Sequence, residues 1–198
     1  MKKLRTVSIA AMISILIVEL SGCALLKNEL GVMKSAMKGR QAIIQTYDEE
    51  SNIIDKIEGS SIDISRETDF DTEKTNSSVI NITIGGDEMV HVGSSLIMHE
   101  KGLENCFETF AKTVDIKNFD RSIPFLNKMV NSWDNITTGK SKVILVRSQS
   151  GKPLATFTGD KVSYFSTDID KSTGILIDGK YLFIYKCDYT IYDGDLLK

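Results

Sequence analysis

The sequence has few of the residues on which several functional classes depend. Only two of its 198 residues are proline, which excludes a proline-rich stalk that would span a cell wall. It has two histidines and three cysteines, and neither type shows the close pairing that is typical of zinc sites. No repeat of fixed period appears either. These absences leave a single, ordinary globular domain as the expectation.

The sequence also lacks an excess of positive charge. The whole chain carries −3, and its first 22 residues carry +2, so residues 23–198 carry −5. A mildly acidic domain has no electrostatic footprint for nucleic acid or for anionic lipid headgroups. We therefore expect no nucleic-acid partner.

A third absence is an apolar run of membrane-spanning length, which requires about 20 residues. The uncharged and mostly apolar run Val7–Val18 follows three basic residues among the first five, and Glu19 ends it. Such an order is typical of a secretory signal peptide. A permanent transmembrane helix is the weaker alternative because the run is too short.

The four residues Leu20-Ser21-Gly22-Cys23 follow this run. They resemble the bacterial lipoprotein cleavage box at all four positions. The resemblance implies cleavage between Gly22 and Cys23 and transfer of a diacylglyceryl group to the Cys23 thiol. Two acyl chains are enough for stable membrane anchoring. The alternative is a chance cysteine after an ordinary signal, and Glu19 is the one unusual residue for a lipoprotein signal.

The box divides the chain into three parts. Residues 1–22 are expected to be the signal peptide, residues 23–40 a membrane-proximal helix, and residues 41–198 a single β-rich globular domain. In the second part, Met33 and Met37 belong to an apolar stripe with spacings of three and four. We expect this stripe to pack on the domain; the alternative is that the helix lies on the membrane.

From Gln41 onward the apolar residues alternate with a period of two, and turn residues such as Gly85-Gly86 and Asp178-Gly179 separate the runs. Neighbouring strands joined by short turns predict an antiparallel sheet, and no βαβ alternation favours a parallel one. The predicted fold class is therefore α+β, mainly an antiparallel sheet of hairpins, with the N-terminal helix and one mid-chain helix over residues 121–133. Residues 103–119 fit either a short helix or irregular structure. Strands are expected at residues 42–47, 53–58, 61–65, 79–84, 89–92, 96–99, 143–147, 154–158, 161–165, 175–177, 181–185 and 189–192.

Two cysteines, Cys106 and Cys187, are left once Cys23 is set aside for lipid. In an extracytoplasmic protein an even remainder suggests a disulfide. A bridge over this distance in sequence would stabilise the fold by roughly 4 kcal/mol. The alternative, which we favour, is two separate buried thiols.

Three tyrosines near the C-terminus, Tyr181, Tyr185 and Tyr189, fall on one face at a period of two. One interpretation is an exposed aromatic face that binds a glycan or an extended peptide. The other, which we favour, is a core layer of the sheet with hydroxyl groups at its rim.

No catalytic motif is complete. His99-Glu100 has the composition of an acid–base pair, but Ser94 and Ser95 lack the Gly-x-Ser-x-Gly context of a nucleophile elbow. His91 and His99 are best interpreted as ordinary rim or surface residues. We therefore expect no enzyme.

Nucleotide and calcium motifs are incomplete as well. Thr138-Gly139-Lys140-Ser141 ends like a phosphate loop, but Asp134 stands where the first glycine is required. The segments 69–73 and 168–172 begin like calcium loops, yet neither has glycine at its sixth position. The sequence predicts no cofactor and no metal.

The segments His91–Ile97 and Arg147–Phe157, together with the box and the helix after it, resemble a family of predicted lipoproteins from Gram-positive bacteria and their prophages. The family is classed as a domain of unknown function. The resemblance covers nearly all of the chain after the box. It implies a surface-exposed location and supplies no site residues.

These observations predict a lipid-anchored protein on the extracytoplasmic face of the cell membrane, which acts as a non-enzymatic binding module. Its partners are the membrane, through Cys23, and a protein or cell-wall component that the sequence does not specify. One alternative is a prophage-encoded lipoprotein that excludes superinfecting phage. Another is a small carboxylate-dependent hydrolase, which a pocket with two facing carboxylates would favour.

Overall fold

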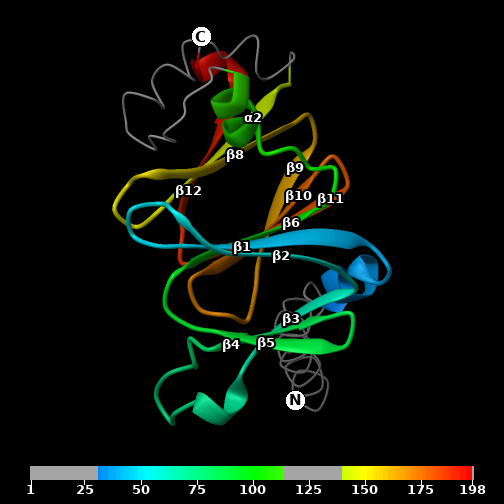
Figure 1. The fold of residues 1–198 in the computed structure, drawn as a ribbon, viewed down its shortest axis with the longest axis vertical. Helices are drawn as coiled ribbons and strands as arrows, with labels where there is room; N and C mark the ends of the chain where they lie inside the picture. Colours follow the sequence, from blue (N-terminus) through cyan, green and yellow to red (C-terminus); the bar gives the residue numbers. More distant parts are fainter. Residues whose placement is uncertain (1–30, 114–139, 198) are drawn as a thin grey trace, which may run out of the picture.

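The computed structural model describes residues 31–113 and 140–197 (Figure 1). Residues 31–37 are helical and form the last part of the predicted N-terminal helix; the rest of that helix, and the predicted helix over residues 121–133, lie outside the described residues. The last helical residue is Met37, and the chain leaves the helix through Gly39, whose φ of 77° is accessible to glycine at little cost. Both Met33 and Met37 are buried, as expected from the apolar stripe.

Twelve strands in the described residues form three sheets, and every pairing between these strands is antiparallel. The predicted antiparallel, mainly β fold is thus confirmed. The six-stranded central sheet has the order β2 (Ile53–Ser60), β1 (Gln41–Tyr47), β6 (Ser95–Glu100), β11 (Lys180–Tyr185), β10 (Ser172–Ile177) and β9 (Val162–Ser166). The second sheet consists of β12 (Asp188–Asp193), β7 (Lys142–Arg147) and β8 (Pro153–Gly159). The third consists of β3 (Ile62–Arg66), β4 (Ile80–Ile84) and β5 (Asp87–His91).

The helical elements are short. Residues 103–119, which the sequence leaves open between a short helix and irregular structure, contain the helix α2 (Cys106–Thr113). Two single-turn 3-10 helices, η1 (Thr68–Phe70) and η2 (Gly194–Leu197), lie in a loop and at the C-terminal end. Residues 31–113 and 140–197 hold no helix with the length and apolar content needed to cross a membrane.

The inner strands of the central sheet are buried on both faces, with the second sheet on one side and the third sheet on the other (Figure 1). Its edge strands β2 and β9 are largely exposed. Alternation along the strands explains this arrangement. On β11, Phe183 enters the core shared with the third sheet and the helix at residues 31–37, whereas Leu182 enters the core shared with the second sheet. On β6, Met98 and Ile97 divide in the same way. The result is a three-layer protein with two apolar cores.

The predicted hairpin turns are present. Asp178 and Gly179 have φ values of 48° and 82°, and Gly85 and Gly86 have 63° and 108°. Positive φ at both central residues is the requirement of a two-residue turn that matches strand twist. The turns join β10 to β11 and β4 to β5, as the sequence pattern predicts.

Candidate binding groove

The predicted tyrosine face does not exist as one surface. Tyr181 and Tyr185 are buried in the core beneath the third sheet, and the Tyr185 hydroxyl bonds to the backbone carbonyl of Ser78. The strand then breaks at Lys186, whose φ is 50°, and Tyr189 belongs to β12 in another sheet. The interpretation as a shared exposed face is therefore wrong, and the core interpretation holds for the first two rings.

Both Cys106 and Cys187 are free thiols, so the disulfide is not formed. The Cys106 sulfur lies 3.7 Å from Thr158 Oγ1, and the Cys187 sulfur lies 3.3 Å from the Tyr185 carbonyl oxygen. Burial raises the pKa of the Cys187 thiol to about 12. The two cysteines are thus unreactive packing residues, the alternative that we favoured. The lipidation and cleavage residues Cys23 and Gly22 lie outside the described residues.

His99 and Glu100 point in different directions and form no acid–base pair. Glu100 accepts from Arg40 Nη1 at 3.0 Å and from Tyr181 N at 3.2 Å. His99 faces the opposite core, where its ring lies 5.4 Å from the ring of Phe157. Burial is the main reason why the pKa of His99 is lowered, so the imidazole is neutral at pH 7. Alternation along β6 explains the separation.

The incomplete nucleotide motif has a structural role where it is described. Lys140 Nζ forms ion pairs with Asp160 at 2.6 Å and with Asp178 at 3.1 Å. In the incomplete calcium segment, the Asp168 backbone carbonyl accepts from Arg66 Nη1. No group of three or more histidine, cysteine or acidic residues in the described parts of the chain is placed to hold a metal ion.

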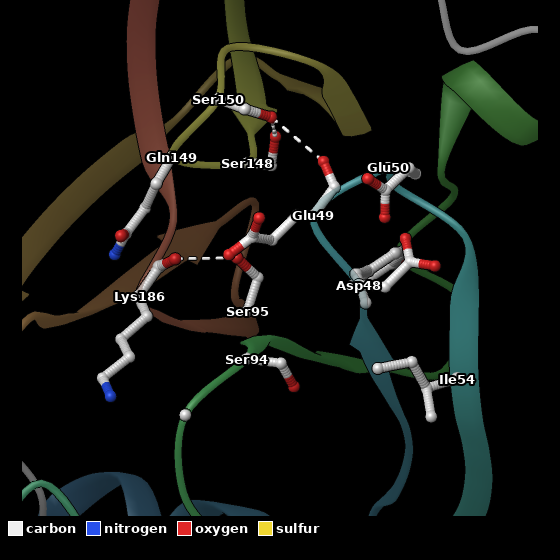
Figure 2. A pocket seen from close by; sticks show the side chains of 12 residues that line it. Asp48, Glu49, Glu50, Ile54, Ser94, Ser95, Ser148, Gln149, Ser150 and Lys186 are labelled. Atoms are coloured by element: carbon white, nitrogen blue, oxygen red, sulfur yellow. Dashed lines mark hydrogen bonds between the residues drawn. The ribbon is translucent and has the colours of Figure 1, made fainter.

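A hollow of about 750 Å³ opens where four chain connections meet (Figure 2). Its walls are residues 47–50 at and after the end of β1, Ile54 of β2, residues 93–95 at the start of β6, residues 148–150 after β7, and Lys186 between β11 and β12. Two sheets therefore contribute to one hollow. Figure 2 shows the side chain of Glu49 pointing into it, with Asp48 and Glu50 on the side away from Lys186.

Hydrogen bonds fix these connections to one another. Ser150 Oγ donates to the Glu49 carbonyl oxygen at 3.0 Å, which joins the turn after β7 to the turn after β1. Ser95 Oγ donates to the Lys186 carbonyl oxygen at 2.7 Å, which joins β6 to the connection between β11 and β12 (Figure 2). The walls are held in place before any ligand arrives, which lowers the entropy cost of binding.

Two smaller hollows, each of about 530 Å³, extend the first one. The second shares Gln149 and Lys186 with the first and also includes Tyr189. The third shares Lys171 and Ser172 with the second. We call this row of three hollows the groove. Its shape suits an elongated ligand.

The backbone at the centre of the groove is unusual. Lys186 N donates to the Lys171 carbonyl oxygen at 2.9 Å, and the two lysines have φ values of 50° and 55°. Residues other than glycine adopt this left-handed conformation at a cost of about 1 kcal/mol each. Lys186 Nζ lies 5.3 Å from the centroid of the Tyr185 ring. The local fold thus holds two ammonium-bearing residues side by side.

Charged side chains of both signs line all three hollows, with Asp188 in the second and Arg66, Asp168 and Asp170 in the third. Glu49 and Glu50 lie in the first hollow, and Lys171 lies in the other two, with Lys186 between them. Among residues 31–113 and 140–197, none forms an ion pair with these four side chains. Asp48 differs, because Asn52 donates to both of its carboxylate oxygens.

Only part of the groove is visible in the sequence. In the sequence, Ser94 and Ser95 stand out only as candidates for a nucleophile, and residues 48–52 are recognisable as a turn. Nothing in the sequence marks Lys171 and Lys186 as left-handed, because lysine is not a turn residue. The signal that exists is indirect: the alternating run Tyr181–Ile191 is too long for one ordinary strand.

Comparisons with known proteins give one match. The family described as a domain of unknown function (DUF5052) matches residues 2–197. No curated protein and no solved structure matches the chain. The match extends over almost the entire sequence, and the chain belongs to the DUF5052 family.

Proposed function

We propose that this protein is a lipid-anchored binding protein on the extracytoplasmic face of the cell membrane, and that it holds its partner in the groove. The proposed location rests on the signal-like N-terminus and on the box Leu20-Ser21-Gly22-Cys23. The binding role rests on one observation. A groove built by connections from different sheets carries charged side chains of both signs, among them Glu49, Glu50, Lys171 and Lys186, that form no ion pair with a described residue.

Several contacts favour binding over catalysis. Ser95 Oγ donates to a backbone carbonyl, and His91 Nε2 lies 3.0 Å from the Ser94 carbonyl oxygen instead of its hydroxyl. A serine nucleophile requires its hydroxyl to donate to a base. The hydrogen bond from the Asn52 side chain is the main reason why the pKa of Asp48 is lowered, whereas a general acid requires a raised one. These contacts support a binding surface.

Few residues separate the proposed lipid from the folded domain, so the domain can extend only a short way from the membrane. Met33 is already buried in the core, and it follows Cys23 by ten positions. Even a fully extended chain of this length covers at most about 35 Å. The partner is therefore expected close to the membrane surface.

Site-specific crosslinking in intact cells tests this proposal. A photoreactive amino acid replaces Gln149, which is exposed in the groove, and in a second strain it replaces Lys161, which is exposed outside it. After irradiation, adducts are purified and identified by mass spectrometry. We expect a defined adduct from position 149 that is absent from position 161. Indistinguishable adducts, or none from position 149, would contradict the proposal.

A further inference from the structure

The most informative feature of the groove is that its first two hollows differ in charge. Three carboxylates and Lys186 line the first hollow, whereas Lys171, Lys186 and a single carboxylate, Asp188, line the second. The third hollow carries both signs, because Arg66 and Lys171 share it with Asp168 and Asp170. The acidic part, Glu49 and Glu50, belongs to the turn between β1 and β2. The basic part, Lys171 and Lys186, flanks the β10–β11 hairpin at its open end. A ligand of uniform charge would be attracted by one part and repelled by the other. A ligand with both signs at separate positions would match both parts.

The basic part has the donors that a carboxylate requires. The backbone hydrogen bond between Lys186 N and Lys171 O holds the two lysines next to each other. Gln149 and Thr173 line the same hollow with amide and hydroxyl groups. Asp188 also lines it, so the hollow is not uniformly positive. Because each ammonium group is a donor and a carboxylate has two acceptor oxygens, both lysines can donate to one carboxylate.

The shape and the remaining side chains favour a peptide over a glycan. Three hollows in a row suit an extended chain, and serines at positions 94, 95, 148 and 150 line the first of them. Ser95 and Ser150 already donate to backbone carbonyls of the protein, so toward a peptide they can serve as acceptors for its N–H groups. Tyr47 lines the first hollow but is fully covered, and Tyr189 is only partly exposed. A flat aromatic platform for sugar rings is therefore not built among the described residues.

We infer that the groove binds an extended peptide segment that presents a cationic side chain to Glu49 and Glu50 and a carboxylate to Lys171 and Lys186. This inference rests on the proposed binding function and specifies its ligand. The groove would recognise two features of this peptide: its extended backbone and the separation of its positive and negative charges along the chain.

Fluorescence anisotropy with short labelled peptides tests the inference on the full-length chain in detergent. One probe has lysines at one end and aspartates at the other, and it is made in both chain directions. Controls of the same length carry only lysines or only aspartates as charged residues, and a neutral chitin oligomer represents glycans. We expect the mixed-charge probe, in one direction, to bind about tenfold tighter than either uniform control. The preference should weaken as salt rises.

A pair of variants places the effect in the groove. Asparagine tolerates positive φ, so Lys171→Asn with Lys186→Asn removes the charges without straining the backbone. This double variant should lose the preference for the mixed-charge probe. Lys161→Asn, the matched control outside the groove, should retain it.

The inference is overturned if mixed and uniform peptides bind equally, if none binds, or if the double variant behaves like Lys161→Asn. It is also overturned if the chitin oligomer binds better than every peptide. The proposed function survives each of these results as long as crosslinking from position 149 still captures a specific adduct. Failure of both experiments rejects the groove as a binding site.

Discussion

Asn105 Oδ1 accepts a hydrogen bond from Thr156 N at 3.1 Å and thereby covers the free edge of β8 with the start of α2. The same oxygen accepts from Phe107 N at 3.2 Å, so Asn105 is also the N-cap of α2. One buried side chain thus satisfies two backbone donors from different elements. Without it, the edge of the second sheet would present an unpaired N–H group.

Replacing this residue should therefore destabilise the protein. We expect Asn105→Ala to lower the free energy of unfolding by about 2–3 kcal/mol, because it removes a cap and leaves a buried donor unpaired. Asn105→Ser keeps a cap but is too short to serve both donors, and it should lose about half as much. Urea unfolding followed by circular dichroism measures both variants. A loss within 0.5 kcal/mol for the alanine variant, as for an ordinary surface change, would contradict this role.

A second prediction concerns Glu100, which is buried and bonds to Arg40 and Tyr181 N. Glu100→Ala should cost about 2–3 kcal/mol, because the Tyr181 N–H loses its acceptor inside the protein. Glu100→Gln keeps an acceptor oxygen and loses only the charge, so it should cost about 1 kcal/mol. The same unfolding measurement compares the two. Equal losses would show that charge alone matters.

The ionisation of Asp178 makes the free energy of unfolding depend on pH. Backbone N–H groups, first that of Lys161, and then Lys140 hold the pKa of Asp178 below its ordinary value. A carboxyl whose pKa is lowered in the folded state stabilises the protein above its unfolded pKa of about 3.9, and that stabilisation disappears as the pH falls through the folded pKa. The free energy of unfolding should therefore fall below about pH 4.

The variant Asp178→Asn isolates this contribution, since asparagine also tolerates the positive φ of the turn. Burial lowers the pKa of His99, so protonation of that residue destabilises both proteins alike in acid. The difference in unfolding free energy between wild type and Asp178→Asn should be largest near pH 7 and shrink below about pH 4. A difference that does not change with pH would contradict the lowered pKa of Asp178 as the cause of this stabilisation.

The anchor gives a prediction about location. Cys23→Ala removes the thiol that would accept the diacylglyceryl group. The variant should either appear in the medium or accumulate as an unprocessed precursor with its signal attached. Intact-mass analysis of membrane and medium fractions distinguishes the two results. An unchanged mass together with unchanged membrane retention would refute lipidation.

Local patterns were sufficient to predict most strands. Alternation identified β4 and β11, and Asp178-Gly179 identified the turn between β10 and β11, because these signals depend only on neighbouring residues. The strand that begins at Tyr181 shows where such signals fail. The period of two continues through Lys186, so the sequence places Tyr181, Tyr185 and Tyr189 on one face and does not show that β11 and β12 belong to different sheets.

The layers and the groove depend on interactions between distant segments. Alternation shows that Leu182 and Phe183 face opposite sides, but not which sheet covers each side. The groove requires the turn after β1 to meet the turn after β7, a contact made by Ser150 and Glu49 across about a hundred residues of sequence. Such a contact follows from packing and leaves no local pattern.

The most direct test of the central claim joins the groove to its partner in living cells. The photoreactive amino acid at position 149 is combined with Lys171→Asn and Lys186→Asn, and the adduct is compared with that from the unaltered groove. The account predicts that the specific adduct falls to the background of the position 161 control. An adduct of undiminished yield would contradict it.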